Sequence, residues 1–207
     1  MAAGWSIEEI TKFYGSYAKS YDEDIEKETY PAPFIIANWV LEHFSNMVPD
    51  QDYLAFLDLG CGTGQSSKLF FTQPLSQRID VYGVDATPEM LDKAKQFPFR
   101  ELLCQDIEAD IPFARVFDAI ICVGVLDFVK NPQNLFTSVA RSLKQNGQGC
   151  FAVTLPESGG LNTFAEADIL KLVNEAGFKI KKNDRFFGYE DSETKVTVHY
   201  HGLLLTL

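Results

Sequence analysis

The stretch FLDLGCGTGQSS, residues 56–67, joins an apolar run to three alternating glycines and decides the expected fold. The run that leads into it, YLAFLDLG at residues 53–60, is short and nearly all apolar, which is typical of a strand buried on both faces of a parallel sheet. Gly60, Gly62 and Gly64 form a turn in which a ligand can approach the backbone closely. The stretch therefore predicts a binding loop at the end of a central strand.

Strand-like and helix-like segments alternate from this point onward. The strand-like segments are residues 53–60, 79–85, 100–106, 149–155 and one run within 116–129. Helix-like segments begin at residue 66 and cover 87–96, 132–147 and 163–178. Two extended stretches, 179–187 and 195–207, follow one another without a helix between them, so they should pair antiparallel. The pattern predicts an α/β fold with a mostly parallel sheet, helices on both faces, and a ligand site at the carboxyl ends of the strands.

Residues 1–50 precede this alternation and are predicted to be helical. Ser6 and Glu9 have the spacing of a capping box, so a helix should run from Ser6 to Ser20. A second helix is expected within residues 29–44, with Pro33 in its first turn. We expect residues 1–50 to form an N-terminal helical lid segment and residues 51–207 the ligand-binding domain, within a single compact domain overall.

The composition narrows the class of protein. The 207 residues are 46% hydrophobic, which is enough for one well-packed core, and the net charge of −11 disfavours nucleic acid and anionic membranes as partners. The four cysteines form no CxxC pair, which indicates reduced thiols. Because thiols stay reduced in the cytoplasm, we expect a cytoplasmic protein. The N-terminus does not resemble a signal peptide, and no histidine spacing indicates a metal site.

The glycine loop can be tested first against a dinucleotide site. Such a site requires G-x-G-x-x-G and an acid about 20 residues further on. The acid is present as Asp85, but Gln65 stands where the third glycine belongs. Asp58 would also place a like charge beside a pyrophosphate, whereas it favours a cation. A ligand with a ribose and positive charge fits better, and S-adenosylmethionine (SAM) has both.

Four segments in order resemble the motifs of the class I SAM-dependent methyltransferases. They are LDLGCGTG at 57–64, VYGVDATPEML at 81–91, CQDIEADIPF at 104–113 and FDAIICVGVLDFV at 117–129. The resemblance is strong over residues 53–155 and holds in outline elsewhere. It implies the Rossmann-like fold of that class, with a seven-stranded sheet that is mostly parallel and has an antiparallel C-terminal strand. It also implies SAM as the cofactor.

The resemblance assigns roles to individual residues. Asp85 should hold the ribose hydroxyls, Asp106 should face the adenine amino group, and Val123 should lie under the sulfonium. The implied cofactor-binding residues are Asp58, Gly60, Cys61, Gly62, Gly64, Asp85, Ala86, Met90, Asp106, Ile107 and Val123, with Tyr14 and Tyr21 as lid residues. The alternatives are purely structural roles. Asp58 and Asp85 could be turn residues, and the tyrosines could be ordinary aromatic residues that pack the helix against the protein.

The ends of the chain also resemble a subfamily, the methyltransferase-like protein of the Williams–Beuren syndrome chromosomal region. The shared features are YGSYAKSYDEDIEKETYPAP at residues 14–33 and a final strand that changes from aromatic to aliphatic. This resemblance implies no particular substrate.

The methyl acceptor should be bound by residues around the core motifs. Residues 1–35, the segment after the fourth strand and the loop 186–194 supply a small, partly aromatic pocket, which favours a small-molecule substrate. Asp127 follows the fourth strand directly, so we expect it at the mouth where the methyl group should project, and it is the candidate catalytic residue; the alternative is that it caps the turn that follows. The sequence leaves open a SAM-binding protein that transfers nothing, a nicotinamide-dependent oxidoreductase, and the oligomeric state.

Overall fold

The computed structural model describes residues 5–28, 30–45, 53–72, 79–111, 113, 117–145, 147–158, 162–190 and 195–207. Within these residues, no helix is both long and apolar enough to cross a membrane. Residues 191–194 of the loop 186–194 considered above lie outside the described residues, as do residues 159–161.

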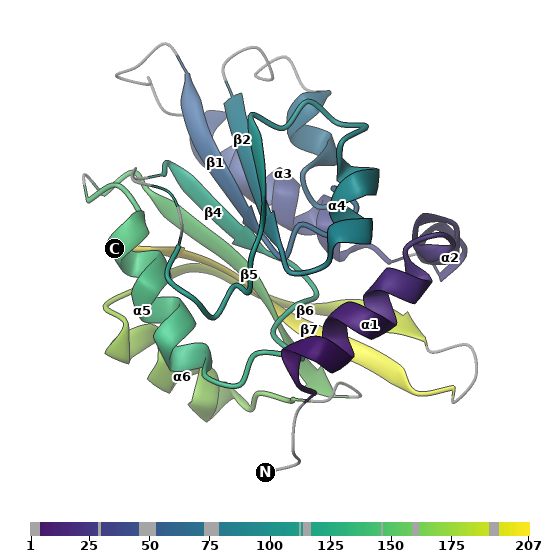
Figure 1. The fold of residues 1–207 in the computed structure, drawn as a ribbon. Coiled ribbons are helices and arrows are strands. Elements are labelled where there is room, and N and C mark those ends of the chain that lie inside the picture. Colours follow the sequence, from purple (N-terminus) through teal and green to yellow (C-terminus); the bar gives the residue numbers. More distant parts are fainter. Residues whose placement is uncertain are drawn as a thin grey trace.

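Seven strands form one sheet in the order β3-β2-β1-β4-β5-β7-β6 (Figure 1). The strands are β1 Leu54–Leu59, β2 Ile79–Asp85, β3 Glu101–Cys104, β4 Ala119–Cys122, β5 Cys150–Ser158, β6 Lys179–Glu190 and β7 Thr197–Thr206. β7 runs antiparallel to both β5 and β6, and the other pairings are parallel. This arrangement confirms the predicted Rossmann-like fold and places the reversal of strand order between β1 and β4, where α/β folds bind ligands.

Helices cover both faces of the sheet. α3 Ala32–Ser45 packs in a core cluster with Phe56 and Ile121, whereas α5 Pro132–Ser142 and α6 Glu166–Glu175 pack in a second cluster with Leu57. Because successive residues of a strand point to opposite faces, the two clusters lie on opposite sides of the sheet. α4 Pro88–Ala94 lies beside β2 and β3.

The N-terminal segment differs from the prediction in two ways. The predicted first helix ends early, as α1 Ile7–Tyr17, and a separate helix, α2 Tyr21–Glu28, follows after a turn. Three acids, Asp22, Glu23 and Asp24, occupy the first turn of α2, where the helix dipole favours negative charge. The capping box is confirmed, because the Ser6 and Glu9 side chains each accept the backbone N–H of the other residue at 3.2 and 2.7 Å.

The expected boundary at residue 50 does not match the packing. Six residues of α3 are buried, and α3 contacts β4, β5 and β7, so it belongs to the core of the domain. α1 has no buried residue and lies beyond the strand ends, so α1 and α2 alone have the character of a cover. The helix expected from residue 66 is a short 3-10 helix, Lys68–Phe71, in the described part of that segment.

Candidate functional site

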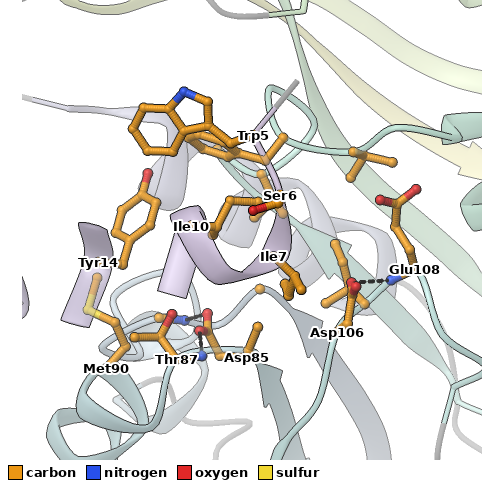
Figure 2. A pocket seen from close by; sticks show the side chains of 18 of the residues that line it. Trp5, Ser6, Ile7, Ile10, Tyr14, Asp85, Thr87, Met90, Asp106 and Glu108 are labelled. Atoms are coloured by element: carbon orange, nitrogen blue, oxygen red, sulfur yellow. Dashed lines mark hydrogen bonds between the residues drawn. The ribbon is translucent and has the colours of Figure 1, made fainter. Parts of the chain in front are cut away.

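A cavity of about 430 Å³ lies at the carboxyl ends of the parallel strands, beneath α1. Its walls come from the segments that follow β1, β2, β3 and β4, and its cover comes from residues 5–14. Figure 2 shows Trp5, Ile10 and Tyr14 on one side of the cavity and Asp85 and Thr87 on the other. The volume lies within the range of small-molecule sites, roughly 300–1,000 Å³.

The glycine loop forms one wall. Gly60, Gly62 and Gly64 all have positive φ angles, of 74°, 51° and 93°, which favours glycine at each position. A Cβ atom at Gly60 would lie 2.4 Å from Cγ2 of Val125, whereas one at Gly62 would meet no atom within 4 Å. The loop therefore needs glycine at position 60 for packing, and at position 62 it presents bare backbone to the cavity.

Asp85 is fixed at the end of β2 by backbone donors. Its Oδ2 accepts the N–H of Gly62 at 2.9 Å, and its Oδ1 accepts the N–H of Thr87 at 2.8 Å (Figure 2). Burial raises the pKa of this carboxyl, and the two N–H groups lower it. Since a carboxylate oxygen can accept more than one hydrogen bond, Asp85 is oriented and can still accept from hydroxyls in the cavity.

The loop after β3 adds two further acids. The Asp106 Oδ1 accepts the N–H of Glu108 at 2.9 Å. The Glu108 carboxylate in turn accepts the N–H groups of Lys130 and Asn131 at 3.1 and 2.7 Å, which ties this loop to the segment after β4. Asp106 and Glu108 line the cavity together with Ile107.

α1 and α2 are each held over the cavity. Phe128 packs against Trp5 and against Tyr14 of α1, with ring centroids 5.8 and 5.7 Å apart, and α1 also contacts α4. The Thr63 hydroxyl of the glycine loop donates to the carboxylate of Asp22, in α2, at 2.6 Å. Among the described residues, the cover therefore rests on aromatic contacts, the packing of α1 against α4 and this hydrogen bond.

Most of the predicted cofactor-binding residues meet at this cavity. Those that line it are Gly60, Gly62, Asp85, Ala86, Met90, Asp106, Ile107, Val123, Tyr14 and Tyr21. Three others, Asp58, Cys61 and Gly64, do not line it. The Cys61 side chain is buried beside Gly83, and a Cβ at Gly64 would meet Phe97 at 2.7 Å, so both positions serve the packing of the loop.

Asp58 is buried beneath the glycine loop. Its Oδ2 accepts the hydroxyls of Ser66 and Ser67 at 2.6 and 2.7 Å, and its Oδ1 has no hydrogen-bond partner among the described residues. Burial raises the pKa of Asp58 to about 6 in spite of the two hydroxyls. The predicted contact between Asp58 and a cationic ligand stays a prediction.

Asp127 lies next to the cavity but does not line it. Its side chain is buried, and its Oδ1 has no hydrogen-bond partner among the described residues. Asn131 accepts the N–H of Asn134 as the N-cap of α5. In the described part of the chain, the Asp127 carboxylate is hydrogen-bonded to Tyr200 and to its own backbone, and its role as a cap of the following turn stays a prediction.

Sequence reasoning missed several lining residues, namely Trp5, Ile7, Ile10, Thr87, Glu108, Phe128 and Lys130. Ile7, Ile10 and Tyr14 follow helical spacing, so the apolar stripe of α1 was a readable signal. Glu108 carries no such signal, because its role depends on a loop that is distant in the sequence. No group of three His, Cys, Asp or Glu side chains in the described ranges could hold a metal ion.

Known proteins resemble this chain in sequence and in fold. A family model described as a methyltransferase domain matches residues 57–151. The ubiquinone biosynthesis O-methyltransferase of Coxiella burnetii is 33% identical over 101 residues, which cover 46% of this chain and 42% of that protein. The trans-aconitate 2-methyltransferase of Azoarcus sp. is 33% identical over 112 residues, which cover 54% and 42%. The chain thus spans less than half the length of these curated relatives.

A solved structure extends the likeness over nearly the whole chain. The S-adenosylmethionine-dependent methyltransferase from Clostridium acetobutylicum has a TM-score of 0.65 at 20% identity, covering 94% of this chain and 98% of that one. The fold is that of the class I SAM-dependent methyltransferases, and residues 57–151 carry the sequence of a methyltransferase domain. SAM is the cofactor that this domain and fold imply.

Proposed function

We propose that this protein is a SAM-dependent methyltransferase that acts on a small molecule. The observation that carries the proposal is the Asp85 carboxylate, held by the N–H groups of Gly62 and Thr87 at the edge of a covered cavity. A carboxylate in that position suits a vicinal pair of ribose hydroxyls, because each oxygen can accept one of them.

The residues present fit this cofactor by their charge. Four acids line the cavity, Glu8, Asp85, Asp106 and Glu108, against the single cation Lys130 among its described residues. This balance favours a ligand with a positive sulfonium and ammonium, and disfavours a pyrophosphate. When bound, SAM supplies a methyl group on a good leaving group. The chain itself would orient the acceptor and exclude water, and orientation alone can be worth roughly 7–11 kcal/mol.

Calorimetric titration with SAM and with NAD tests the cofactor. We expect SAM and its demethylated product to bind and NAD to show no measurable heat. Binding of NAD in place of SAM would support the nicotinamide-dependent oxidoreductase and end the proposal.

Methyl transfer needs a separate test, because a sensor or partner subunit could bind SAM and transfer nothing. Incubating the protein with labelled SAM and pooled small metabolites should label a low-molecular-weight product. Label that stays in SAM while SAM binds tightly would favour the non-transferring alternative.

We propose further that residues 5–28 act as the lid. α1 has no buried residue and contacts Phe128, and α2 is held by the Thr63–Asp22 hydrogen bond, so the two helices can open without disturbing the core. A partly covered site of about 430 Å³ also supports a small acceptor over a macromolecule.

Two finer assignments complete the proposal. Residues 14–33 and the final strand support placement in the subfamily of the Williams–Beuren methyltransferase-like proteins. Cys61, Cys122 and Cys150 are free and buried, which supports a reducing, cytoplasmic location. Activity in cytosolic extract, and its absence from washed membranes, would test the location.

A further inference from the structure

Tyrosines from four separate segments gather in one cluster, and three of them, Tyr14, Tyr30 and Tyr200, lie within range of the Asp127 charge. Tyr14 belongs to α1, Tyr30 precedes α3, Tyr189 lies on β6 and Tyr200 lies on β7. The ring centroid of Tyr30 is 6.0 Å from that of Tyr189 and 6.2 Å from that of Tyr200. Burial raises the pKa of Tyr14, Tyr30 and Tyr200 well above the usual value, and the negative charge of Asp127 adds a smaller rise to each. We call these four tyrosines and Asp127 the tyrosine cluster.

Two polar atoms of the tyrosine cluster are buried without a hydrogen-bond partner among the described residues. They are the Asp127 Oδ1 and the Tyr30 hydroxyl. The Tyr30 oxygen lies beside the Tyr200 hydroxyl, whose hydrogen bond lowers the pKa of Tyr30 part of the way back from the rise that burial causes, but the Tyr30 proton has no acceptor among the described residues. An unpaired buried polar group costs about 1–3 kcal/mol, and native proteins contain few of them. The Asp127 oxygen and the Tyr30 proton are therefore the two groups of the cluster that a ligand could pair with.

The tyrosine cluster adjoins the cavity at two points. A Cβ atom at Gly124, which lines the cavity, would lie 2.5 Å from the Tyr30 hydroxyl. Tyr14 also lines the cavity (Figure 2); burial raises its pKa most, and the nearby Asp127 and Tyr30 raise it further. Because Tyr14 is carried by the unburied helix α1, an outward shift of α1 would join the cluster to the cavity.

We propose that Asp127 and Tyr30 bind the hydroxyl group of a small planar acceptor, and that Asp127 takes the hydroxyl proton during transfer. This inference rests on the proposed methyltransferase function. The step is balanced: the acceptor oxygen forms the new C–O bond, and the C–S bond of SAM breaks with its electron pair going to sulfur. The proton moves to the Asp127 carboxylate and leaves to solvent with the product.

A hydroxyl matches the two unpaired atoms better than an amine does. The hydroxyl can donate its proton to Asp127 Oδ1 and accept the proton of Tyr30 with its lone pair. A protonated amine has no lone pair, so it would leave the Tyr30 proton unpaired. The tyrosine rings around the site favour a planar, aromatic body, since aromatic pairs add about 0.5–1.5 kcal/mol beyond their buried area.

The protonation states suit these roles. Burial raises the pKa of Asp127 to about 7, and a hydrogen bond from the Tyr200 hydroxyl lowers it part of the way back. A base works best when its pKa lies close to the working pH. Burial also raises the pKa of Tyr30 well above its usual value, so that Tyr30 keeps its proton and remains a donor. The groups that face Asp127 in the described residues are the tyrosines Tyr14, Tyr30 and Tyr200.

Phenol and benzylamine are a matched pair of probes for this site. Each is titrated by calorimetry into the full chain saturated with S-adenosylhomocysteine, and into the chain alone. We expect phenol to bind about tenfold more tightly than benzylamine. Asp127→Asn and Tyr30→Phe should each weaken phenol binding about tenfold, while the controls Asp80→Asn and Tyr53→Phe should leave it unchanged. Phenol binding should strengthen as the pH rises through about 7, and Asp127→Asn should remove that dependence.

Three results would overturn the proposal. They are equal or tighter binding of benzylamine, phenol affinity that neither substitution changes, and the absence of phenol binding. If Asp127→Asn does not fold, the phenol affinity of Tyr30→Phe and the pH dependence of phenol binding to the unaltered chain still test the proposal. Failure of S-adenosylhomocysteine to bind would instead contradict the proposed function, and the phenol titration without it would still test the acceptor site.

Discussion

The cavity and the tyrosine cluster beside it differ in how their acids are hydrogen-bonded. At the proposed cofactor end, the cavity itself, Asp85 and Asp106 accept backbone N–H groups of the surrounding loops. At the proposed acceptor end, the tyrosine cluster, the Asp127 Oδ1 and the Tyr30 proton have no partner among the described residues. By these proposals, the chain alone orients Asp85 and Asp106, whereas the acceptor end needs a ligand to complete its hydrogen bonds.

The largest expected effect is on the acceptor end. Asp127→Asn should lower the single-turnover rate by roughly 10²–10⁴, because the amide cannot take a proton. SAM affinity, measured by calorimetry, should stay within about twofold, because the cofactor end does not use Asp127. Normal turnover in a folded Asp127→Asn protein would contradict the proposed role of Asp127 as the proton acceptor at the acceptor end.

The pH dependence of stability provides a second test of the comparison. The folded pKa of Asp127 is about 7, against a usual value of 3.8, so the unfolded chain ionises first as the pH rises. Asp127 therefore lowers the stability progressively between about pH 4 and pH 7, and its cost is constant above that. Relative to the unaltered chain, Asp127→Asn should gain roughly 2–3 kcal/mol in the free energy of unfolding between about pH 5 and pH 8.

Urea unfolding at those two pH values measures this gain. Asp58, whose pKa burial raises to about 6, contributes to the pH dependence of both proteins and cancels in the difference. A difference that does not change with pH would show that Asp127 is not held in a desolvated site.

Substitutions that loosen the cover, α1 and α2, should have a smaller effect, which is on the dissociation rate of SAM. Phe128→Ala removes two aromatic contacts, with Trp5 and Tyr14, each worth about 0.5–1.5 kcal/mol. Dissociation of SAM, followed by stopped flow, should become about fivefold to fiftyfold faster, with the fold intact. Deleting residues 1–20 should go further and leave a folded domain whose melting temperature responds less to SAM. A truncated chain that fails to fold would contradict the lid, and an unchanged dissociation rate in Phe128→Ala would show that these contacts do not hold it.

The difference between the cofactor end and the acceptor end also explains which parts of the site the sequence could predict. The cofactor end was predictable because its residues follow β1, β2 and β3 in consecutive motifs, and Gly60, Asp85 and Asp106 were found from those motifs. The alternation of strands and helices likewise predicted the sheet and its antiparallel last strand. These features depend on local spacing, which the sequence displays directly.

What the sequence could not show depends on long-range packing. The tyrosine cluster brings together residues 14, 30, 127, 189 and 200, and no spacing rule links them. Asp58 stands in the glycine motif, yet its side chain turns toward Ser66 and Ser67, away from the lining of the cavity. Which way a side chain points at the end of a strand is decided by its neighbours in space.

The most direct measurement compares the SAM affinity of the unaltered chain with that of Asp85→Ala. Charge-assisted hydrogen bonds to the ribose are worth roughly 1.5–3 kcal/mol, so the affinity for SAM and for S-adenosylhomocysteine should fall about tenfold to a hundredfold. Asp80→Asn, on the same strand β2, is the control and should bind as the unaltered chain does. Unchanged affinity in a folded Asp85→Ala protein would contradict the cofactor site that the fold and cavity define.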